Sequence, residues 1–462
     1  MTPVGGVDES PLALAERALE HVSGEAQVTV TVEQSLVSRF ARSRPTQATQ
    51  VDDRTVEILC VIDGHTGAAT TNRTDEDALR DAALRAAGAA QAAASSGPGS
   101  YPGLPQPATP RGHEGFDPIT ARLEPDTAAA NLKAAFAVAA ENGQEAFGIW
   151  TAGAVETAIA SSTGLRVSDR VTDAFAKVIC RDGQGRSGFA SDAAVRAADI
   201  DVEAVARRAA QRVPREEPLD LPPGEYPVVL EAEAVGLLLE FLGWLGFNGL
   251  AHAEGRGALS GRLGTRVAAA AINLSDSPRF ARTLPRAFDA EGVPKAPLPL
   301  IQDGVAHRVV HDNASAARAG GGAASTGHAL AAGGSPDGPA PTNLVLIGGG
   351  AADEHELAAP IERGLYVTRL WYVNPVREQD ALLTGMTRDG TYLIEDGHIT
   401  RPVRDVRFTD SVLRILAAVE ALGARQRLVT EGEFYGRRFA TGVVCPPLRA
   451  GGLRVTGATT GA

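Results

Sequence analysis

The alternation of hydrophobic and polar positions predicts helices and strands from the start of the chain. Residues 10–22 begin with Ser10 and Pro11, a favourable N-cap and first helical residue, and then place leucine and alanine at helical spacing. Residues 27–33 alternate with a period of two, which is typical of a strand with one buried face. A second strand is expected at residues 56–62.

Two alanine-rich segments have helical spacing and recognisable ends. Thr74, followed three residues later by Asp77, resembles a capping box, which predicts a helix over residues 75–95. A helix is also expected over residues 127–142, because Asn142 and the glycine after it are typical of a helix end. The other elements expected before residue 213 are a loop at 95–118, strands near 147–160 and 164–180, and a helix near 199–212.

A proline-rich segment divides the chain. Residues 214–224 contain four prolines and one glycine, and proline lacks the N–H donor that regular structure requires. We therefore predict two domains, an N-terminal α+β domain at residues 1–222 with antiparallel strands and alanine-rich helices, and a C-terminal domain at residues 223–462.

The C-terminal domain is predicted to be mainly antiparallel and barrel-like with a few helices, because few helical segments separate its strands. Two Asp-Gly pairs, at 303–304 and 396–397, predict tight hairpins. The other expected elements are a strand at 226–230, an apolar helix at 231–246, a mobile surface loop at 319–341, and a helix at 410–422 capped by Thr409 or Asp410 and ended by Gly423.

Composition and charge narrow the function. The chain has 462 residues, 44% of them hydrophobic, with 44 Lys+Arg against 56 Asp+Glu and a formal net charge of −12. This composition is globular, and we expect a cytoplasmic protein because neither a long apolar span nor a signal peptide is evident. An acidic chain without a basic stripe is not expected to bind nucleic acid.

Cysteine and histidine limit any metal site. Cys60, Cys180 and Cys445 fit no disulfide framework and no all-cysteine zinc site. His307 and His311 have a spacing that lets two imidazoles share a metal, but in the strand expected there the favoured interpretation is two solvent-facing histidines. Asp312 is the only further ligand nearby.

Glu240 is the polar residue that stands out in the apolar helix at 231–246. An ionised carboxylate in such a helix is costly, so Glu240 must lie at an edge, be paired or carry a raised pKa. The favoured interpretation is a core helix with one accommodated glutamate. A catalytic role needs a second group, and the helix supplies none.

The order and spacing of several segments resemble the TldD/TldE (PmbA) family over nearly the whole chain. The likeness is weaker in the N-terminal half, at residues 28–40 and 56–95. In the C-terminal half it lies in the helix around Glu240 and in residues 226–230, 258–264, 341–346, 364–368, 394–402, 447–449 and 455–457.

This resemblance implies a degenerate metal site. TldD-type subunits of the family are zinc peptidases whose helix carries H-E-x-x-x-H, with a cysteine ligand near the C-terminus. On this chain the motif positions fall on Leu239, Glu240 and Trp244, and the cysteine position falls near Gly432, with Cys445 about a dozen residues too late. Leucine, tryptophan and glycine offer no side-chain ligand to zinc.

The resemblance therefore implies a TldE-like, non-catalytic subunit without metal or cofactor of its own. Its expected partner is a zinc-bearing TldD-like subunit in a heterodimer that hydrolyses extended, unfolded peptides or peptide-like natural products. Three alternatives remain: a displaced site on His307, His311 and Asp312, a homodimeric module that binds peptides without cleaving them, and an N-acyl hydrolase of the deacetylase type.

Overall fold

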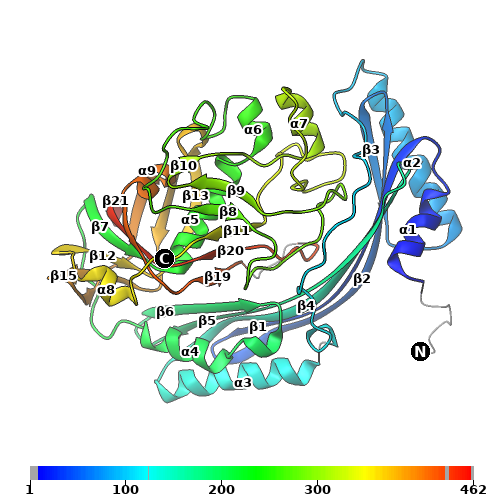
Figure 1. Cartoon of the computed structure of the whole chain (residues 1–462). Helices are drawn as coiled ribbons and strands as arrows, with labels where there is room; N and C mark the ends of the chain where they lie inside the picture. The colour runs from blue at the N-terminus through cyan, green and yellow to red at the C-terminus, as the bar shows by residue number, and fades with distance from the viewer. Residues whose placement is uncertain (1–8, 123, 432–435, 459–462) are drawn as a thin grey trace.

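The N-terminal half folds into one sheet of long strands in the computed structural model, which describes every residue except 1–8, 123, 432–435 and 459–462. These strands are β1 (Glu25–Ala41), β2 (Arg44–Ile62), β3 (His65–Thr71), β4 (Glu145–Ser161), β5 (Arg166–Arg181) and β6 (Ser187–Ala194). Their order is β3-β2-β1-β4-β5-β6 and every pairing is antiparallel. The sheet curves around the rest of the molecule (Figure 1).

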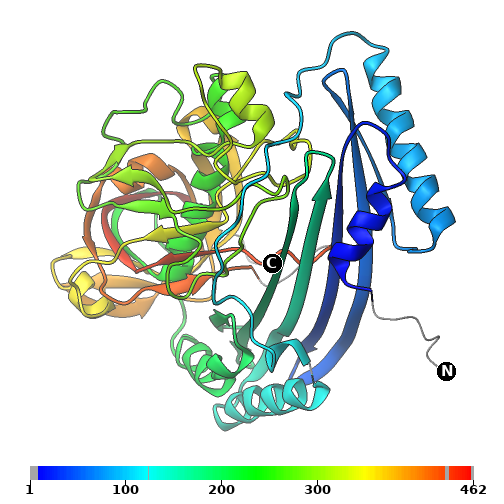
Figure 2. The same ribbon diagram turned by 45° about the vertical axis from the view of Figure 1, so that its right-hand side comes forward.

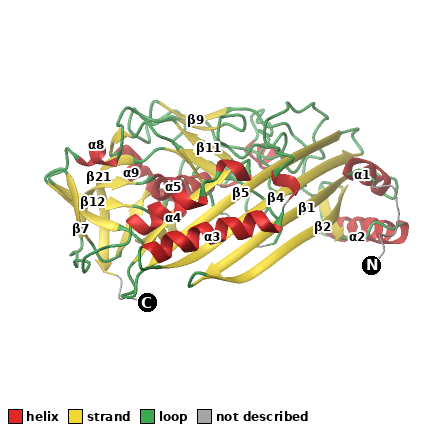
Figure 3. Cartoon of the chain, turned by 90° about the horizontal axis from the view of Figure 1, so that it is seen from below, coloured by secondary structure: helices red, strands yellow, loops and turns green. Residues whose placement is uncertain are grey.

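The two faces of this sheet have different partners. In β1, Val28, Val30 and Leu36 belong to clusters with the helices, whereas Thr31 and Glu33 face the C-terminal half, as the period of two requires. The helices lie on the outer side of the sheet (Figures 1 and 2), and α3 and α4 cross the long strands (Figure 3). These helices are α1 (Pro11–Leu19), α2 (Glu76–Ala94), α3 (Pro125–Glu141) and α4 (Val202–Gln211), with 3-10 turns η1 (Thr120–Arg122) and η2 (Ala197–Asp199).

The C-terminal half contains two further sheets. The first has the order β10-β9-β8-β11-β20-β19. Its strands are β8 (Leu274–Asp276), β9 (Leu298–Gln302), β10 (Val305–Ala306), β11 (Asn343–Leu346), β19 (Arg427–Val429) and β20 (Gly442–Cys445). β11 and β20 run parallel, and the other pairs are antiparallel.

The second sheet has nine strands in the order β13-β14-β17-β21-β7-β12-β15-β16, with β18 paired to β21. Only β7 and β12 pair in parallel in this sheet as described. Its strands are β7 (Gly224–Leu230), β12 (Arg363–Val367), β13 (Leu370–Arg377), β14 (Leu382–Thr387), β15 (Thr391–Glu395), β16 (His398–Pro402), β17 (Val406–Ser411), β18 (Val419–Leu422) and β21 (Leu448–Ala458).

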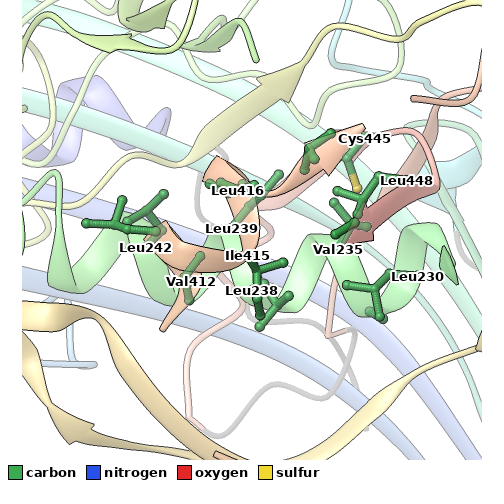
Figure 4. Packing of buried hydrophobic residues seen from close by; sticks show 14 of the residues in the cluster. Leu230, Val235, Leu238, Leu239, Leu242, Val412, Ile415, Leu416, Cys445 and Leu448 are labelled. Carbon is green, nitrogen blue, oxygen red and sulfur yellow. The ribbon is translucent and has the colours of Figure 1, made fainter. Parts of the chain in front are cut away.

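One apolar helix, α5 (Ala232–Leu245), forms the centre of the C-terminal core. Its leucines share one hydrophobic cluster with side chains from both C-terminal sheets, including Leu274 of the first and Leu448 of the second. Figure 4 shows Leu448 among the leucines of α5. The remaining helices are short: α6 (Gly249–Ala253), α7 (Asn313–Ala319), α8 (Glu354–Ala358), α9 (Val412–Ala417) and the 3-10 turn η3 (Glu378–Asp380). None of the described helices is long and apolar enough to span a membrane.

The mixed α+β class predicted from the sequence is confirmed, and the antiparallel N-terminal strands with it. Ser10 caps α1 as expected, accepting a hydrogen bond from the Ala13 N–H at 3.2 Å. Among the described strands, no pairing closes either C-terminal sheet into a barrel. The division into two domains at residue 222 stays a prediction.

Four local predictions are wrong. Asp75, rather than Thr74, caps α2, because its side chain accepts the Ala78 N–H. The helix expected at 410–422 is only α9, capped by Ser411, and β18 takes up residues 419–422. The segment 319–341 is irregular as predicted but is not only surface, since His328 within it is buried. Residues 307–309 follow β10 and form no strand.

Candidate functional site

The predicted motif positions lie on α5 but face different surroundings. Leu239 is fully buried and lies with Leu242 and Leu416 in the C-terminal core (Figure 4). Trp244 is 54% exposed, with its ring 5.9 Å from that of Phe241 in an edge contact. Leu239 therefore packs in the core while Trp244 faces outward, and neither side chain offers a ligand atom to zinc.

Glu240 lies beside a small cavity of about 110 Å³ that is also lined by Thr342, Val429, Glu431 and Phe439. It is half-buried and makes no hydrogen bond or ion pair with any described residue. Burial, together with the charge of Glu431, raises the pKa of Glu240 to about 7. The sequence left three possibilities for Glu240: a position at an edge, a paired charge or a raised pKa. The structure favours the raised pKa.

The cysteine position of the family motif, near Gly432, lies outside the described residues. Cys445 is fully buried in β20, where its thiol donates to the carbonyl of Ala232 at 3.3 Å. Burial raises the pKa of this thiol well above its usual value. Zinc binds the thiolate, so Cys445 packs in the core as a neutral thiol and does not fit a ligand role.

The second candidate cluster is dispersed. His307 is exposed, whereas His311 is half-buried with its Nδ1 3.2 Å from the hydroxyl of Ser315. Asp312 is buried and caps α7, accepting the Ser315 N–H at 2.7 Å. Within the described part of the chain, no three His, Cys, Asp or Glu side chains are placed to hold a metal ion together.

A buried ion network was missed from the sequence. Asp276 accepts the N–H groups of Thr342 and Asn343, both at 2.8 Å, and its other oxygen lies 3.5 Å from Lys295 Nζ and 3.3 Å from His328 Nε2. Burial would raise the pKa of Asp276, but these two neighbours hold it well below its usual range. The three titratable groups come from positions far apart in the sequence, so no spacing pattern predicts the network.

A second buried carboxyl group, that of Glu291, has a raised pKa. Glu291 accepts the hydroxyl of Tyr101 at 3.1 Å and the N–H of Asn313 at 2.9 Å, and it is fully buried. Burial, and secondly the nearby Asp289, raise the pKa of Glu291 to about 8. Burial also raises the pKa of Asp289 to about 6. Glu291 is bonded to Tyr101 and Asn313, and Asp289 accepts the N–H of Ala329. These bonds join distant segments of the chain, which indicates a role in stabilising the fold.

Comparison with known proteins accounts for most of the chain. Models of three parts of the PmbA/TldA metallopeptidase family match: domain 1 at residues 26–90, the central domain at 121–215 and the C-terminal domain at 223–457. A protein named "Metalloprotease" from Methanothermobacter thermautotrophicus is 27% identical over 238 residues, which is 49% of each chain. The match thus spans about half the length of that curated relative.

Solved structures share the fold. TldE from Thermococcus kodakarensis superposes with a TM-score of 0.84 at 20% identity, covering 96% of this chain and 99% of that one. A Thermotoga maritima protein, described as a proposed modulator of a DNA gyrase, superposes with a TM-score of 0.80 at 21% identity, covering 94% and 96%. At these identities the likeness establishes the architecture alone.

Proposed function

The chain belongs to the PmbA/TldD metallopeptidase family, and we propose that within it the chain is a non-catalytic, TldE-like subunit of a metal-dependent peptidase. One observation carries the proposal. The α5 positions that would supply histidine ligands hold a core leucine and an exposed tryptophan. The family's zinc therefore does not fit this helix, because neither side chain has a lone pair to donate.

Glu240 has no catalytic partner in this proposal. A general base must lie within hydrogen-bond reach of the proton it removes, and Glu240 is adjacent to another carboxylate rather than to a cation. Its raised pKa follows from burial and from Glu431. We therefore assign Glu240 to the wall of its cavity.

The proposed partner is a TldD-like chain that carries the zinc, and the proposed substrate is an extended peptide or peptide-like product. In the paired enzyme, this chain would form part of the wall of the substrate cavity and would contact the bound peptide. Main-chain pairing to a sheet edge suits such substrates, because it recognises unfolded segments with little regard to their sequence. The compartment proposed is the reducing cytoplasm, in keeping with three free, buried cysteines.

Metal content tests the non-catalytic assignment. The chain purified alone and dialysed against zinc-containing buffer should hold far less than one zinc per chain by elemental analysis. One tightly bound zinc per chain would contradict it. Substitution Glu240→Gln provides a second test, since hydrolysis by the reconstituted pair should stay within about twofold if Glu240 transfers no proton.

Sizing tests the partner. Mixed with a TldD-like chain that carries an intact H-E-x-x-x-H helix, the protein should elute as a 1:1 heterodimer. A homodimer that persists in the presence of that chain would favour a peptide-binding module instead. Hydrolysis by this chain alone, abolished by His307→Ala and His311→Ala, would favour the displaced site.

A further inference from the structure

A large cleft lies between the N-terminal sheet and the C-terminal half. Its volume is about 1200 Å³, at the upper end of what small-molecule sites require. One wall is formed by β6, η2 and α4, and the other by residues 278–285 and the start of β19. In Figure 1, β19 lies directly above β6, which is where the two halves approach.

The charge of this cleft is opposite to that of the molecule. Three acidic residues line it, Glu114, Asp192 and Asp199, against six arginines. The whole chain, in contrast, has a formal net charge of −12. The six are Arg196, Arg208, Arg279, Arg282, Arg425 and Arg427.

Some of these arginines hold the walls together. Arg427 donates to the carbonyl of Ser191 on β6 at 2.6 Å and pairs with Glu233 of α5 at 3.1 Å. Arg208 of α4 reaches the same carbonyl at 3.3 Å, and its Nε is buried without a hydrogen-bond partner. Arg279 donates to three backbone carbonyls and Arg282 to one.

Two arginines are not used by the fold. Arg196 and Arg425 are both exposed, and neither side chain makes a hydrogen bond or close ion pair with another described residue, although the charge of Arg196 acts on the carboxylate of Asp117. They lie on opposite walls of the cleft. Arg196 is the N-cap of η2, and Arg425 lies in the segment before β19. Each adds a positive charge to its wall of the cleft, and an anionic ligand would offset these charges.

Two sheet edges also border the cleft. β6 is the last strand of the N-terminal sheet and β19 is the last strand of the first C-terminal sheet. At the cleft, however, the carbonyl of Ser191 is bonded by Arg208 and Arg427 and the N–H of Ala193 by Asp192, so a bound segment would be held mainly by side chains. The lining offers Phe280 as its aromatic side chain, so it lacks the series of stacking surfaces that single-stranded nucleic acid uses.

We propose that this cleft binds an extended acidic peptide segment, whose carboxylates pair with Arg196 and Arg425. The proposal rests on the proposed function in that it identifies the class of peptide this subunit holds. Asp192 and Glu114 also line the cleft. The ligand can therefore carry neutral or basic residues between its carboxylates. Affinity depends on ionic strength, because the contacts are ion pairs accessible to solvent.

Peptide binding to the chain alone tests the proposal. Fluorescence anisotropy with a labelled ten-residue peptide rich in glutamate should give saturable binding that weakens with added salt. Neutral and lysine-rich peptides of the same length should bind at least about tenfold more weakly. The double variant Arg196→Glu/Arg425→Glu should reduce affinity for the acidic peptide by at least about tenfold.

Two control variants separate charge from folding. Arg80→Glu, on the exposed face of α2 away from the cleft, should leave binding unchanged, and Arg196→Lys/Arg425→Lys should retain most of it. Equal affinity of wild type and the charge-reversed variant would overturn the proposal. So would tighter binding of a single-stranded oligonucleotide of equal charge. The assay needs neither zinc nor a partner, so its failure is distinct from failure of the proposed function.

Discussion

At the scale of single residues, burial decides the chemistry more than residue type does. Leu239 and Glu240 are neighbours in sequence, yet one is in the core and the other lines a cavity. The sequence could show that Leu239 and Trp244 lack ligand atoms. It could not show that Leu239 faces the core, because α5 is apolar on nearly every side and its periodicity is weak.

Restoring the two motif histidines should therefore not restore a zinc site. We expect Leu239→His/Trp244→His to bind no zinc in calorimetric titration, because the cysteine ligand position of the motif falls near Gly432, which has no side chain. The core histidine should lower the free energy of unfolding by about 3 kcal/mol or more, since it leaves a polar ring in a hydrophobic cluster. Trp244→His alone should fold normally, and stoichiometric zinc in the double variant would contradict the assignment.

Glu291 should make stability depend on pH. Its pKa is about 8 in the folded protein against a usual value of 4.5, so the folded state binds the additional proton between these values. The stabilisation is complete below about pH 4.5 and is lost as pH rises through 8. From pH 5 to 7 the loss should be about 2 kcal/mol in the free energy of unfolding.

The variant Glu291→Gln isolates this contribution. Glutamine imitates the protonated acid, because it can accept the Asn313 N–H and donate to Tyr101. We expect the variant to match wild type near pH 5 and to be more stable at pH 8, by urea titration. An unchanged pH dependence in the variant would show that Glu291 ionises normally.

At the scale of elements, turns that depend on adjacent residues were predictable from the sequence. Elements that depend on pairing with a distant strand were not. Asp303 and Asp396 have φ of 47° and 48° and are followed by glycines at 77° and 79°, as the predicted Asp-Gly hairpins require. The helix expected at 410–422 is shortened because residues 419–422 pair with β21. The local propensity of a segment does not show which distant strand it will pair with.

Close packing of α2 on β3 gives a test at this scale. A Cβ on Gly67 of β3 would lie 2.1 Å from the backbone nitrogen of Ala90, so Gly67→Ala must push α2 away. We expect a loss of about 2 kcal/mol or more in the free energy of unfolding. Gly88, on the same helix, has open space around it, and Gly88→Ala should stabilise by about 0.5 kcal/mol. Equal effects of the two variants would refute the close contact.

At the scale of the whole molecule, one buried arginine helps to hold the two halves together. Arg438 is buried and donates to the carboxylate of Asp173 of β5, at 2.6 and 2.8 Å, to the carbonyl of the same residue at 3.4 Å, and to Thr151 of β4 at 3.0 Å. Its own N–H donates to Glu33 of β1. The residue thus anchors the segment before β20 to the inner face of the long sheet.

Removing this side chain should be costly. Arg438→Met leaves Asp173 buried without its cation, and we expect a loss of about 3–5 kcal/mol in the free energy of unfolding. Adding Asp173→Asn should recover part of the loss, because it removes the uncompensated charge. Arg80→Met, which breaks only an exposed pair, should change stability by less than about 0.5 kcal/mol. A similar small change in Arg438→Met would contradict the anchoring role.

The sequence by itself determined most element types and the resemblance to the family, and it showed that Leu239 and Trp244 carry no zinc ligand, because each of these depends on residue identity and order along the chain. Only the tertiary structure decided which charges meet. Asp276, Lys295 and His328 form one network, and arginines from position 196 to 427 line one cleft, although the acidic chain shows no basic stripe. Charges act through distance in space, and folding brings together residues that the sequence keeps far apart.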